Sequence, residues 1–150
     1  MLYSSIVVGT DGSETASLAV SHAIDLAVLS GATLHIVTVG SRFVANVVGA
    51  AGMPAAGELD PNQLTEELME VVNSAASSAR ARGAIVERHA VVGDVVQALC
   101  DVAKRVEADL LVVGNRGMYG FQRFFWESVP DTVSHNAPCS VLIVDTRNAQ

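Results

Sequence analysis

The chain has little of what several classes of protein depend on. Only nine of its 150 residues are lysine or arginine, against 16 aspartates and glutamates, so the formal net charge is −7. The basic residues are scattered, whereas a protein that binds nucleic acid needs a basic face to neutralise phosphates. Two cysteines are too few for a disulfide framework, and we expect Cys100 and Cys139 to be buried, reduced thiols. Neither nucleic-acid binding nor a disulfide-stapled fold is expected.

Long hydrophobic runs are absent too. A long uncharged run, Phe43–Gly57, has 15 residues and contains three glycines and a proline, whereas a membrane-spanning helix needs roughly 20 apolar residues. The amino-terminal segment MLYSSIVVG has no basic stretch of the kind that opens a secretory signal, and it runs directly into a predicted strand. We therefore expect a cytoplasmic protein with no membrane partner.

The sequence also lacks the motifs of common catalytic centres. It contains no H-E-x-x-H, no C-x-x-C, no Walker lysine and no G-x-S-x-G nucleophile elbow. The four histidines, His22, His35, His89 and His135, show no metal-ligand spacing, and we expect His22 and His35 to pack in the fold or face solvent. No catalytic residue and no metal ligand is predicted, and any ATPase activity should be slow.

What the sequence does contain is a regular alternation of two periodicities. Half of its residues are hydrophobic, which at this length fits a single domain, 1–150, with a sizeable core. Short runs rich in β-branched residues predict strands, and apolar residues at three- and four-residue spacing predict helices between them. The predicted strands are Ser5–Val8, Thr33–Val39, Ala84–Val92, Leu110–Val113 and Val141–Val144. The predicted helices are Ala16–Val28, Leu64–Arg82, Asp94–Glu107 and Ser128–Asn136, and Asp94 and Gln97 have capping-box spacing.

One connection stands out from this alternation. Gly40–Asn62 is rich in glycine, alanine and proline and shows no periodicity. A loop of this length inside a domain tends to be either functional or mobile.

The order of the elements predicts an α/β fold, namely an open parallel sheet with helices on both faces. In such a sheet a ligand binds at the carboxyl ends of the strands, where the strand order reverses. The loops Gly9–Ser13 and Gly114–Gly117 follow the first and fourth strands and lie at that end. A helix start is predicted at Glu127–Val129, and glycine loops beside helix starts can direct backbone N–H groups at an anion. The pattern indicates a nucleotide phosphate site.

Four segments of the chain, in order, resemble the universal stress protein family. They are IVVGTDGS at the start, LHIV in the second strand, VVGNRG at the end of the fourth strand and SV..TVSHNAPCSVLIV near the end of the chain. The resemblance covers nearly the whole chain except Gly40–Asn62, a segment that varies widely in that family. It implies a five-stranded parallel sheet in the order 3-2-1-4-5. It also implies a small regulatory stress-response protein that binds an adenine nucleotide without strong catalysis.

The resemblance extends to the nucleotide site of the family. Members that bind ATP carry G-x-x-G, then nine residues, then G-[ST]. Here Gly114 and Gly117 match the first part and Ser128 matches the last position, while Glu127 stands in place of the final glycine. The implied nucleotide-binding residues are Thr10, Asp11, Ile36, Val113, Gly114, Arg116, Gly117, Glu127, Ser128 and Val129.

The resemblance also assigns roles within this set. It brings Asp11 to the adenosine and the backbone of Ile36 to the edge of the adenine, and it places Gly114 beneath the ribose. Glycine permits close approach of the backbone, and a helix start offers free N–H groups. The implied phosphate contacts come from Gly117, Ser128 and Val129.

Glu127 distinguishes this chain from the ATP-binding pattern. A carboxylate about 4 Å from a phosphate charge costs roughly 1–4 kcal/mol at effective dielectrics between 80 and 20. A bridging Mg²⁺ would reverse the sign of that interaction, and a ligand with fewer phosphates would avoid it. Family members that resemble this chain around Ser128-Val129-Pro130 bind cyclic AMP as well as ATP. The candidate ligands are therefore ATP, AMP and cyclic AMP, with Mg²⁺ as a candidate cofactor.

A structural interpretation of the same residues leads to a second class of function. Asp11 or Ser13 can simply cap the first helix, and Gly114 and Gly117 can form no more than a tight turn. The protein would then be a nucleotide-independent dimeric stress or interaction protein with a degraded ATP site. A phospho-acceptor receiver domain is rejected, because the chain lacks paired acids after its first strand and a lysine after its last.

The last strand predicts a homodimer. It is short and apolar, and the family's strand order places it at a sheet edge, where unpaired backbone groups invite pairing with a second copy. The family implies an antiparallel two-fold dimer through Ser140, Val141, Leu142, Ile143 and Val144.

Overall fold

The computed structural model describes residues 2–40, 61–115 and 129–147. Within these residues strands and helices alternate along the chain, as the periodicities predict. In order, the elements are β1 (Ser5–Gly9), α1 (Glu14–Ser30), β2 (Thr33–Gly40), α3 (Pro61–Ala81), β3 (Ile85–Val92), α4 (Val95–Arg105), β4 (Leu110–Gly114), α6 (Val129–Asn136) and β5 (Ser140–Val144).

Several predicted boundaries were wrong, each for a local reason. Helix α3 begins at Pro61 rather than Leu64, because proline at a first helical position lacks only an N–H that would be unpaired there anyway. Helix α4 ends at Arg105 rather than Glu107, whose φ of 50° is left-handed and cannot continue the helix. The predicted loop Gly40–Asn62 is shorter at both ends, and residues 41–60 lie outside the described residues.

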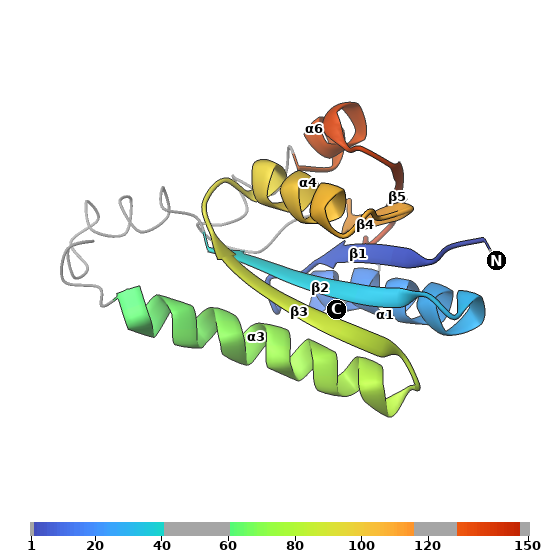
Figure 1. Ribbon diagram of the computed structural model, residues 1–150. Coiled ribbons are helices and arrows are strands. Elements are labelled where there is room, and N and C mark those ends of the chain that lie inside the picture. Colours follow the sequence, from blue (N-terminus) through green and yellow to red (C-terminus); the bar gives the residue numbers. More distant parts are fainter. Residues whose placement is uncertain (1, 41–60, 116–128, 148–150) are drawn as a thin grey trace.

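The strands form one parallel sheet in the order β3-β2-β1-β4-β5, which confirms the predicted topology. Figure 1 shows α1 and α3 on one face of this sheet and α4 and α6 on the other. The order reverses between β1 and β4, so the switch point expected to hold a ligand lies at their carboxyl ends.

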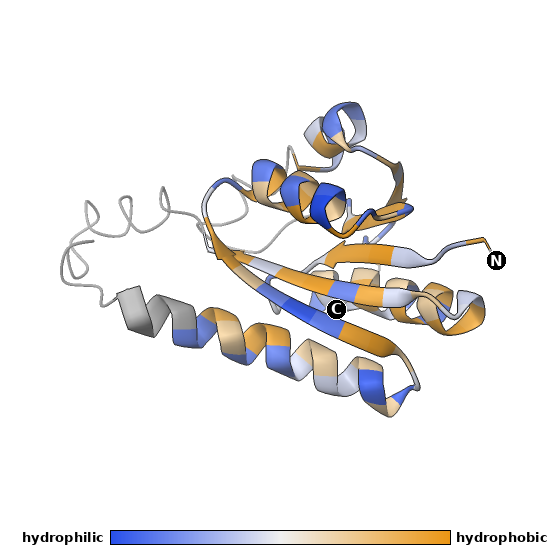
Figure 2. Ribbon diagram, in the orientation of Figure 1, coloured by the Kyte–Doolittle hydropathy of each residue, from blue (hydrophilic) through white to orange (hydrophobic). Residues whose placement is uncertain are grey.

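The core has two layers because successive side chains of a strand point to opposite faces of the sheet. Ile6 and Val8 of β1 pack in the layer beneath α1 and α3, while Val7 between them packs beneath α4 and α6. Both faces of β1 and β4 are apolar, which explains their continuous hydrophobic runs (Figure 2). Cys100 and Cys139 are free but only half-buried, rather than buried as predicted, and burial raises the pKa of both thiols.

Helix caps fix where α1 and α4 begin. Ser13 rather than Asp11 is the N-cap of α1, and its side chain accepts from the N–H of Ala16. Asp94 caps α4 by accepting from the N–H of Gln97 at 2.9 Å, as its spacing predicts. The Gln97 side chain does not complete a capping box; it donates to Asp101 instead.

The edge strand β3 is covered unequally. Helix α3 packs against it and against β2 on one face, while α4 on the other face packs against β1 and β2. On that second face Ile85 is 63% exposed and Glu87 is exposed as well. Figure 2 shows that the middle of β3 is hydrophilic. In the described part of the chain, no helix is long and apolar enough to cross a membrane.

Candidate functional site

The turn after β1 closes tightly against the next strand. The N–H of Thr10 donates to the carbonyl of Val37 in β2 at 2.9 Å, and the Thr10 hydroxyl accepts from the N–H of Gly12 at 3.2 Å. Gly12 has a φ of 83°, and a Cβ there would lie 3.1 Å from a methyl carbon of Val71 in α3. The backbone conformation favours glycine at this position, and a side chain would also have to displace Val71. The turn holds Asp11 in a fixed place beside the switch point.

Asp11 is a half-buried carboxyl group at the carboxyl end of the sheet. Burial raises its pKa above the usual range, and hydrogen bonds from Ser13 partly offset that rise. The carboxyl oxygen Oδ1 accepts from the N–H of Ser13 at 2.8 Å. A desolvated carboxyl group in a crevice is a recognised sign of a functional site. Because Ser13 is the N-cap of α1, the Asp11 carboxyl does not fill that role.

The strand β4 delivers Gly114 to the same end of the sheet. Val112 pairs with Val8 of β1, so Gly114 ends its strand beside the Thr10–Asp11 turn. The next residue, Asn115, was not among the predicted site residues, yet it ties β4 to the chain after β5. Its side-chain oxygen accepts from both the N–H and the hydroxyl of Thr146, each at 2.9 Å. Asparagine at a strand end signals a turn, but its distant partner cannot be read from the sequence.

The remaining described site residues are buried. Ile36 is the register partner of Val8 and lies one residue before the carbonyl that accepts from Thr10. Its side chain faces the core under α1 and α3, and the side chains of Val113 and Val129 face the core under α4 and α6. These three residues can offer a ligand only backbone groups. The predicted residues Arg116, Gly117, Glu127 and Ser128 lie outside the described residues.

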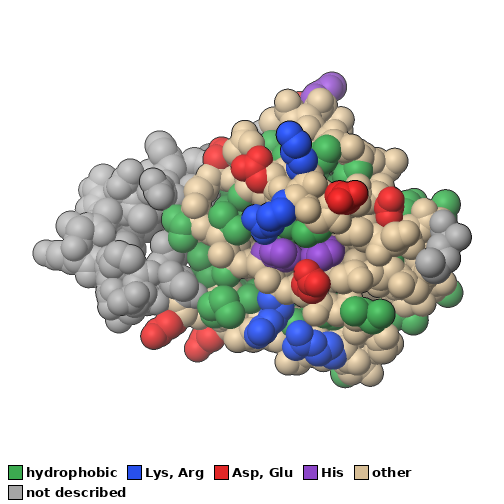
Figure 3. Space-filling view, viewed as in Figure 1, with side chains coloured by type: hydrophobic (Ala, Val, Ile, Leu, Met, Phe, Trp, Pro, Cys, Tyr) green, Lys and Arg blue, Asp and Glu red, His purple; other side chains and the backbone are tan. Residues whose placement is uncertain are grey.

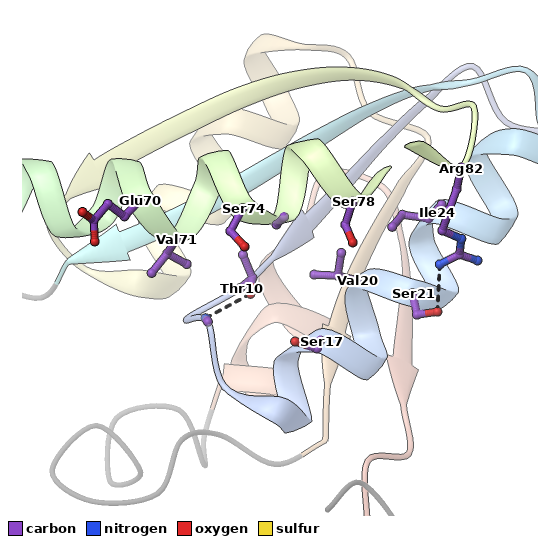
Figure 4. Close-up of a pocket in the computed structure, with 12 residues that line it drawn as sticks. Thr10, Ser17, Val20, Ser21, Ile24, Glu70, Val71, Ser74, Ser78 and Arg82 are labelled. Carbon is purple, nitrogen blue, oxygen red and sulfur yellow. Dashed lines mark hydrogen bonds between the residues drawn. The ribbon is translucent and has the colours of Figure 1, made fainter. Parts of the chain in front are cut away.

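A groove of about 570 Å³ opens beside the turn, a volume in the range of ligand pockets. It runs between α1 and α3 from Thr10 and Gly12 toward Arg82, which donates to Ser21 (Figure 4). Arg82 also forms an ion pair with Asp25. Serines give the groove much of its polar lining; they are Ser17, Ser21, Ser74 and Ser78. No sequence pattern indicates this groove, because it forms between two helices that are far apart in the chain.

A second cluster of polar side chains lies on the other face of the sheet. His35 of β2 is only 5% exposed, and its Nδ1 lies 3.1 Å from Nε2 of His89 and 3.4 Å from a carboxylate oxygen of Glu87 in β3. Sequence spacing missed this group, because His35 and His89 are brought together by strand pairing. The one local signal was that Glu87 and His89 are two residues apart in a strand, so that their polar side chains share one face of the sheet. His22, by contrast, is exposed on α1.

Comparison with known proteins agrees with this fold. The model of the universal stress protein family matches residues 2–145. A universal stress protein of Mycobacterium tuberculosis is 34% identical over 145 residues, which are 96% of this chain and 97% of the relative.

Two solved structures are similar over the whole domain. A universal stress protein in complex with cyclic AMP has 36% sequence identity and a TM-score of 0.71, over 97% of this chain and 99% of the other. A universal stress protein of Archaeoglobus fulgidus in complex with dAMP has 26% identity and a TM-score of 0.68, over 95% and 98% of the two chains. Together with the strand order and the turn after β1, these matches lead to one conclusion. The chain belongs to the universal stress protein family.

Proposed function

We propose that the protein is a regulatory stress-response protein that binds an adenine nucleotide, namely ATP, AMP or cyclic AMP, without strong catalysis. The site lies at the carboxyl ends of β1 and β4. The observation that carries the proposal is Asp11, a half-buried carboxyl group whose pKa is raised by burial at the point where the strand order reverses. Burying a carboxyl group costs free energy unless a partner offsets the lost hydration, and a bound ligand can supply that partner.

The chemistry of Asp11 fits a ribose. A carboxylate accepts hydrogen bonds at two oxygens, and its described hydrogen bonds come from Ser13. The ribose of AMP or ATP offers two hydroxyl donors, and that of cyclic AMP offers one. Thr10 and Gly12 hold the carboxyl in place from either side. Asp11 is thus positioned to accept from a ribose while the rest of the nucleotide extends toward Gly114.

The family comparison supports the same ligand class. Two of the similar structures are complexes with cyclic AMP and with dAMP. Both ligands carry adenine and a single phosphate, which suits a site where Glu127 would repel a longer phosphate chain. In this proposal Arg116, Gly117, Ser128 and Val129 contact the phosphate, and Mg²⁺ is needed to bring ATP beside Glu127.

Titration calorimetry tests the proposal directly. Nucleotide-free protein is titrated in turn with cyclic AMP, AMP, ATP, and ATP with Mg²⁺. We expect micromolar binding of at least one of them, with ATP binding more tightly when Mg²⁺ is present. Protein that is folded by circular dichroism and gives no heat with any of the four would contradict the proposal.

A pair of variants ties the binding to Asp11. Asp11→Asn keeps an oxygen that can accept from Ser13 but removes the charge, so we expect nucleotide affinity to fall at least tenfold. Asp101→Asn removes an exposed carboxylate on α4 and should leave the affinity unchanged. Equal affinities for wild type and Asp11→Asn would show that the carboxylate makes no contact with the nucleotide.

The strand β5 supports a second proposal, a homodimer. It forms one edge of the sheet, and its Ile143 side chain is 42% exposed. An uncovered apolar edge can pair with the same edge of a second copy, and we propose two-fold antiparallel pairing through Ser140–Val144. Light scattering at tens of micromolar protein should give a dimeric mass, and Ile143→Lys should lower it. A monomeric mass for the wild type would rule the dimer out.

The exposed edge also favours an alternative function, a nucleotide-independent interaction protein with a degraded site. A substitution at Glu127 distinguishes the two proposed functions. If Glu127→Gly creates tight ATP binding in a protein that otherwise binds no nucleotide, the site is vestigial and the dimer is the functional unit. If the wild type already binds a nucleotide, the alternative fails.

A further inference from the structure

We propose that His35, Glu87 and His89 form a binding site for a divalent transition-metal ion of the zinc type. The site lies on the face of β2 and β3 that α4 leaves open, opposite the groove between α1 and α3. It is separate from the nucleotide site, and the proposal does not depend on nucleotide binding.

Strand pairing brings the three side chains together. In the parallel register His35 pairs with Glu87, and Val37 pairs with His89. Residues two apart in a strand share a face, and directly paired residues share it too. All three side chains therefore point to the same side of the sheet. Their ligand atoms lie within 4.8 Å of one another.

The distances match a zinc coordination shell. Two ligand atoms that each lie 2.0–2.1 Å from a tetrahedral zinc ion are roughly 3.3–3.4 Å apart. Here Nδ1 of His35 is 3.1 Å from Nε2 of His89 and 3.4 Å from a carboxylate oxygen of Glu87. The third pair, Glu87 and His89, has its ligand atoms within 4.8 Å, so a side-chain movement that draws these two atoms together would complete the shell.

The donor set and its surroundings suit such an ion. Imidazole nitrogens favour zinc and related transition metals over Mg²⁺ or Ca²⁺, and two histidines with one carboxylate leave a fourth position for water. Glu87 is exposed and His89 is half-buried, so the ion can enter from solvent. Figure 3 shows a pair of histidine side chains reaching the surface between basic and acidic groups.

Arg105 of α4 is the competitor for this site. Its guanidinium lies 3.2 Å from Nδ1 of His89, the ring nitrogen that faces away from His35. A metal ion on Nε2 of His89 requires a proton on Nδ1, which cannot accept from Arg105 at the same time. Arg105 is exposed and can turn away. Arg105→Ala should therefore bind the metal more tightly than the wild type.

Calorimetry with Zn²⁺ tests the site in full-length, tag-free protein stripped of metal. We expect one equivalent of Zn²⁺ to bind at micromolar concentration and Mg²⁺ not to bind. His89→Ala and Glu87→Gln should weaken the binding tenfold or more, and Arg105→Ala should strengthen it. The matched controls His22→Ala and His135→Ala remove exposed histidines elsewhere and should change nothing.

Cobalt distinguishes this site from the cysteines. Co²⁺ bound to imidazole and carboxylate gives visible d–d bands without the thiolate charge-transfer band that Cys100 or Cys139 would add. We expect d–d bands alone, lost in His89→Ala. The proposal is overturned if Zn²⁺ does not bind, if His89→Ala binds it as tightly as the wild type, or if the thiolate band appears.

Discussion

Two aspartates lie at opposite ends of the strand pair β1 and β4, and their pKa values are shifted in opposite directions. Asp109 stands before β4 at the amino end of the sheet, and its carboxylate accepts from the N–H groups of Ser4 and Ser5 at 2.6 and 2.9 Å. These bonds lower its pKa. Asp11 stands after β1 at the carboxyl end, where burial raises its pKa. The exposed group has its partners within the fold, and the half-buried group is held where a ligand can supply one.

This difference separates a structural carboxylate from a candidate binding group. Both are aspartates beside strand ends, so residue type alone does not distinguish them. What distinguishes them is the balance between lost hydration and hydrogen bonds gained. Substitutions can test this balance, and also the strand core that holds both aspartates in place.

The shared core of β1 and β4 should matter most, because both aspartates depend on it. Leu111 of β4 is fully buried beside Val7 of β1. Leu111→Ala should lower the free energy of unfolding by roughly 2–5 kcal/mol, since it leaves a cavity. The control Leu2→Ala changes a residue that is 79% exposed and should stay within about 0.5 kcal/mol of wild type. Urea unfolding followed by circular dichroism measures both, and equal losses would mean that the core does not hold the two ends.

The turn that carries Asp11 should show the next largest effect. Gly12 and Gly83 have φ angles of 83° and 93°, but a Cβ would meet Val71 only at Gly12. Alanine at either position should cost roughly 1–2 kcal/mol for the left-handed conformation. Gly12→Ala should cost more than Gly83→Ala and should also weaken nucleotide binding. If thermal unfolding shows the same loss for both variants, packing against α3 does not shape the turn.

Asp11 should make the folded protein less stable as the pH rises. Because its pKa is raised in the folded state, the stability that protonation provides is present at low pH and is lost as the pH rises through the folded-state pKa. Asp11→Asn carries no charge at any pH. It should therefore be at least as stable as wild type at pH 7 and should lose that advantage as the pH falls. A constant difference between pH 3 and pH 8 would show that burial does not destabilise the carboxylate.

Asp109 should have the smallest effect on stability, and its contribution should be lost as the pH falls rather than as it rises. Its pKa is lowered, so its contribution is present above the ordinary aspartate pKa and is lost as the pH falls through the folded-state value. Asp109→Asn should be slightly less stable than wild type at pH 7 and equal to it in acid. The same unfolding series tests this, and a gain in stability at pH 7 would contradict the assignment.

Sequence patterns sufficed for the fold, because strand and helix periodicities act locally. The short apolar runs of β1 and β4 marked strands, and Ser13 or Asp11 marked the start of α1 within two residues. The resemblance of the VVGNRG segment and the closing segment to one family added the strand order. The start of α3 at Pro61 was missed, although proline at a first helical position was a signal.

The sites were harder to predict because they depend on contacts between distant segments. The approach of His35 to His89 follows from the pairing of β2 with β3, and the serine-lined groove from how α1 packs beside α3. The raised pKa of Asp11 depends on its burial, which the sequence around it does not reveal. Asn115 likewise looked like an ordinary turn residue, although it fastens β4 to Thr146.

Amide hydrogen exchange, followed by NMR with and without saturating cyclic AMP and again with ATP and Mg²⁺, tests the central claim most directly. We predict that a nucleotide slows exchange at Thr10, Gly12 and Asn115, at the carboxyl end of the sheet. Exchange at Ser4 and Ser5, at the amino end, should stay unchanged. No slowing at the carboxyl end with either nucleotide, or slowing confined to the amino end or to β3, would contradict the account.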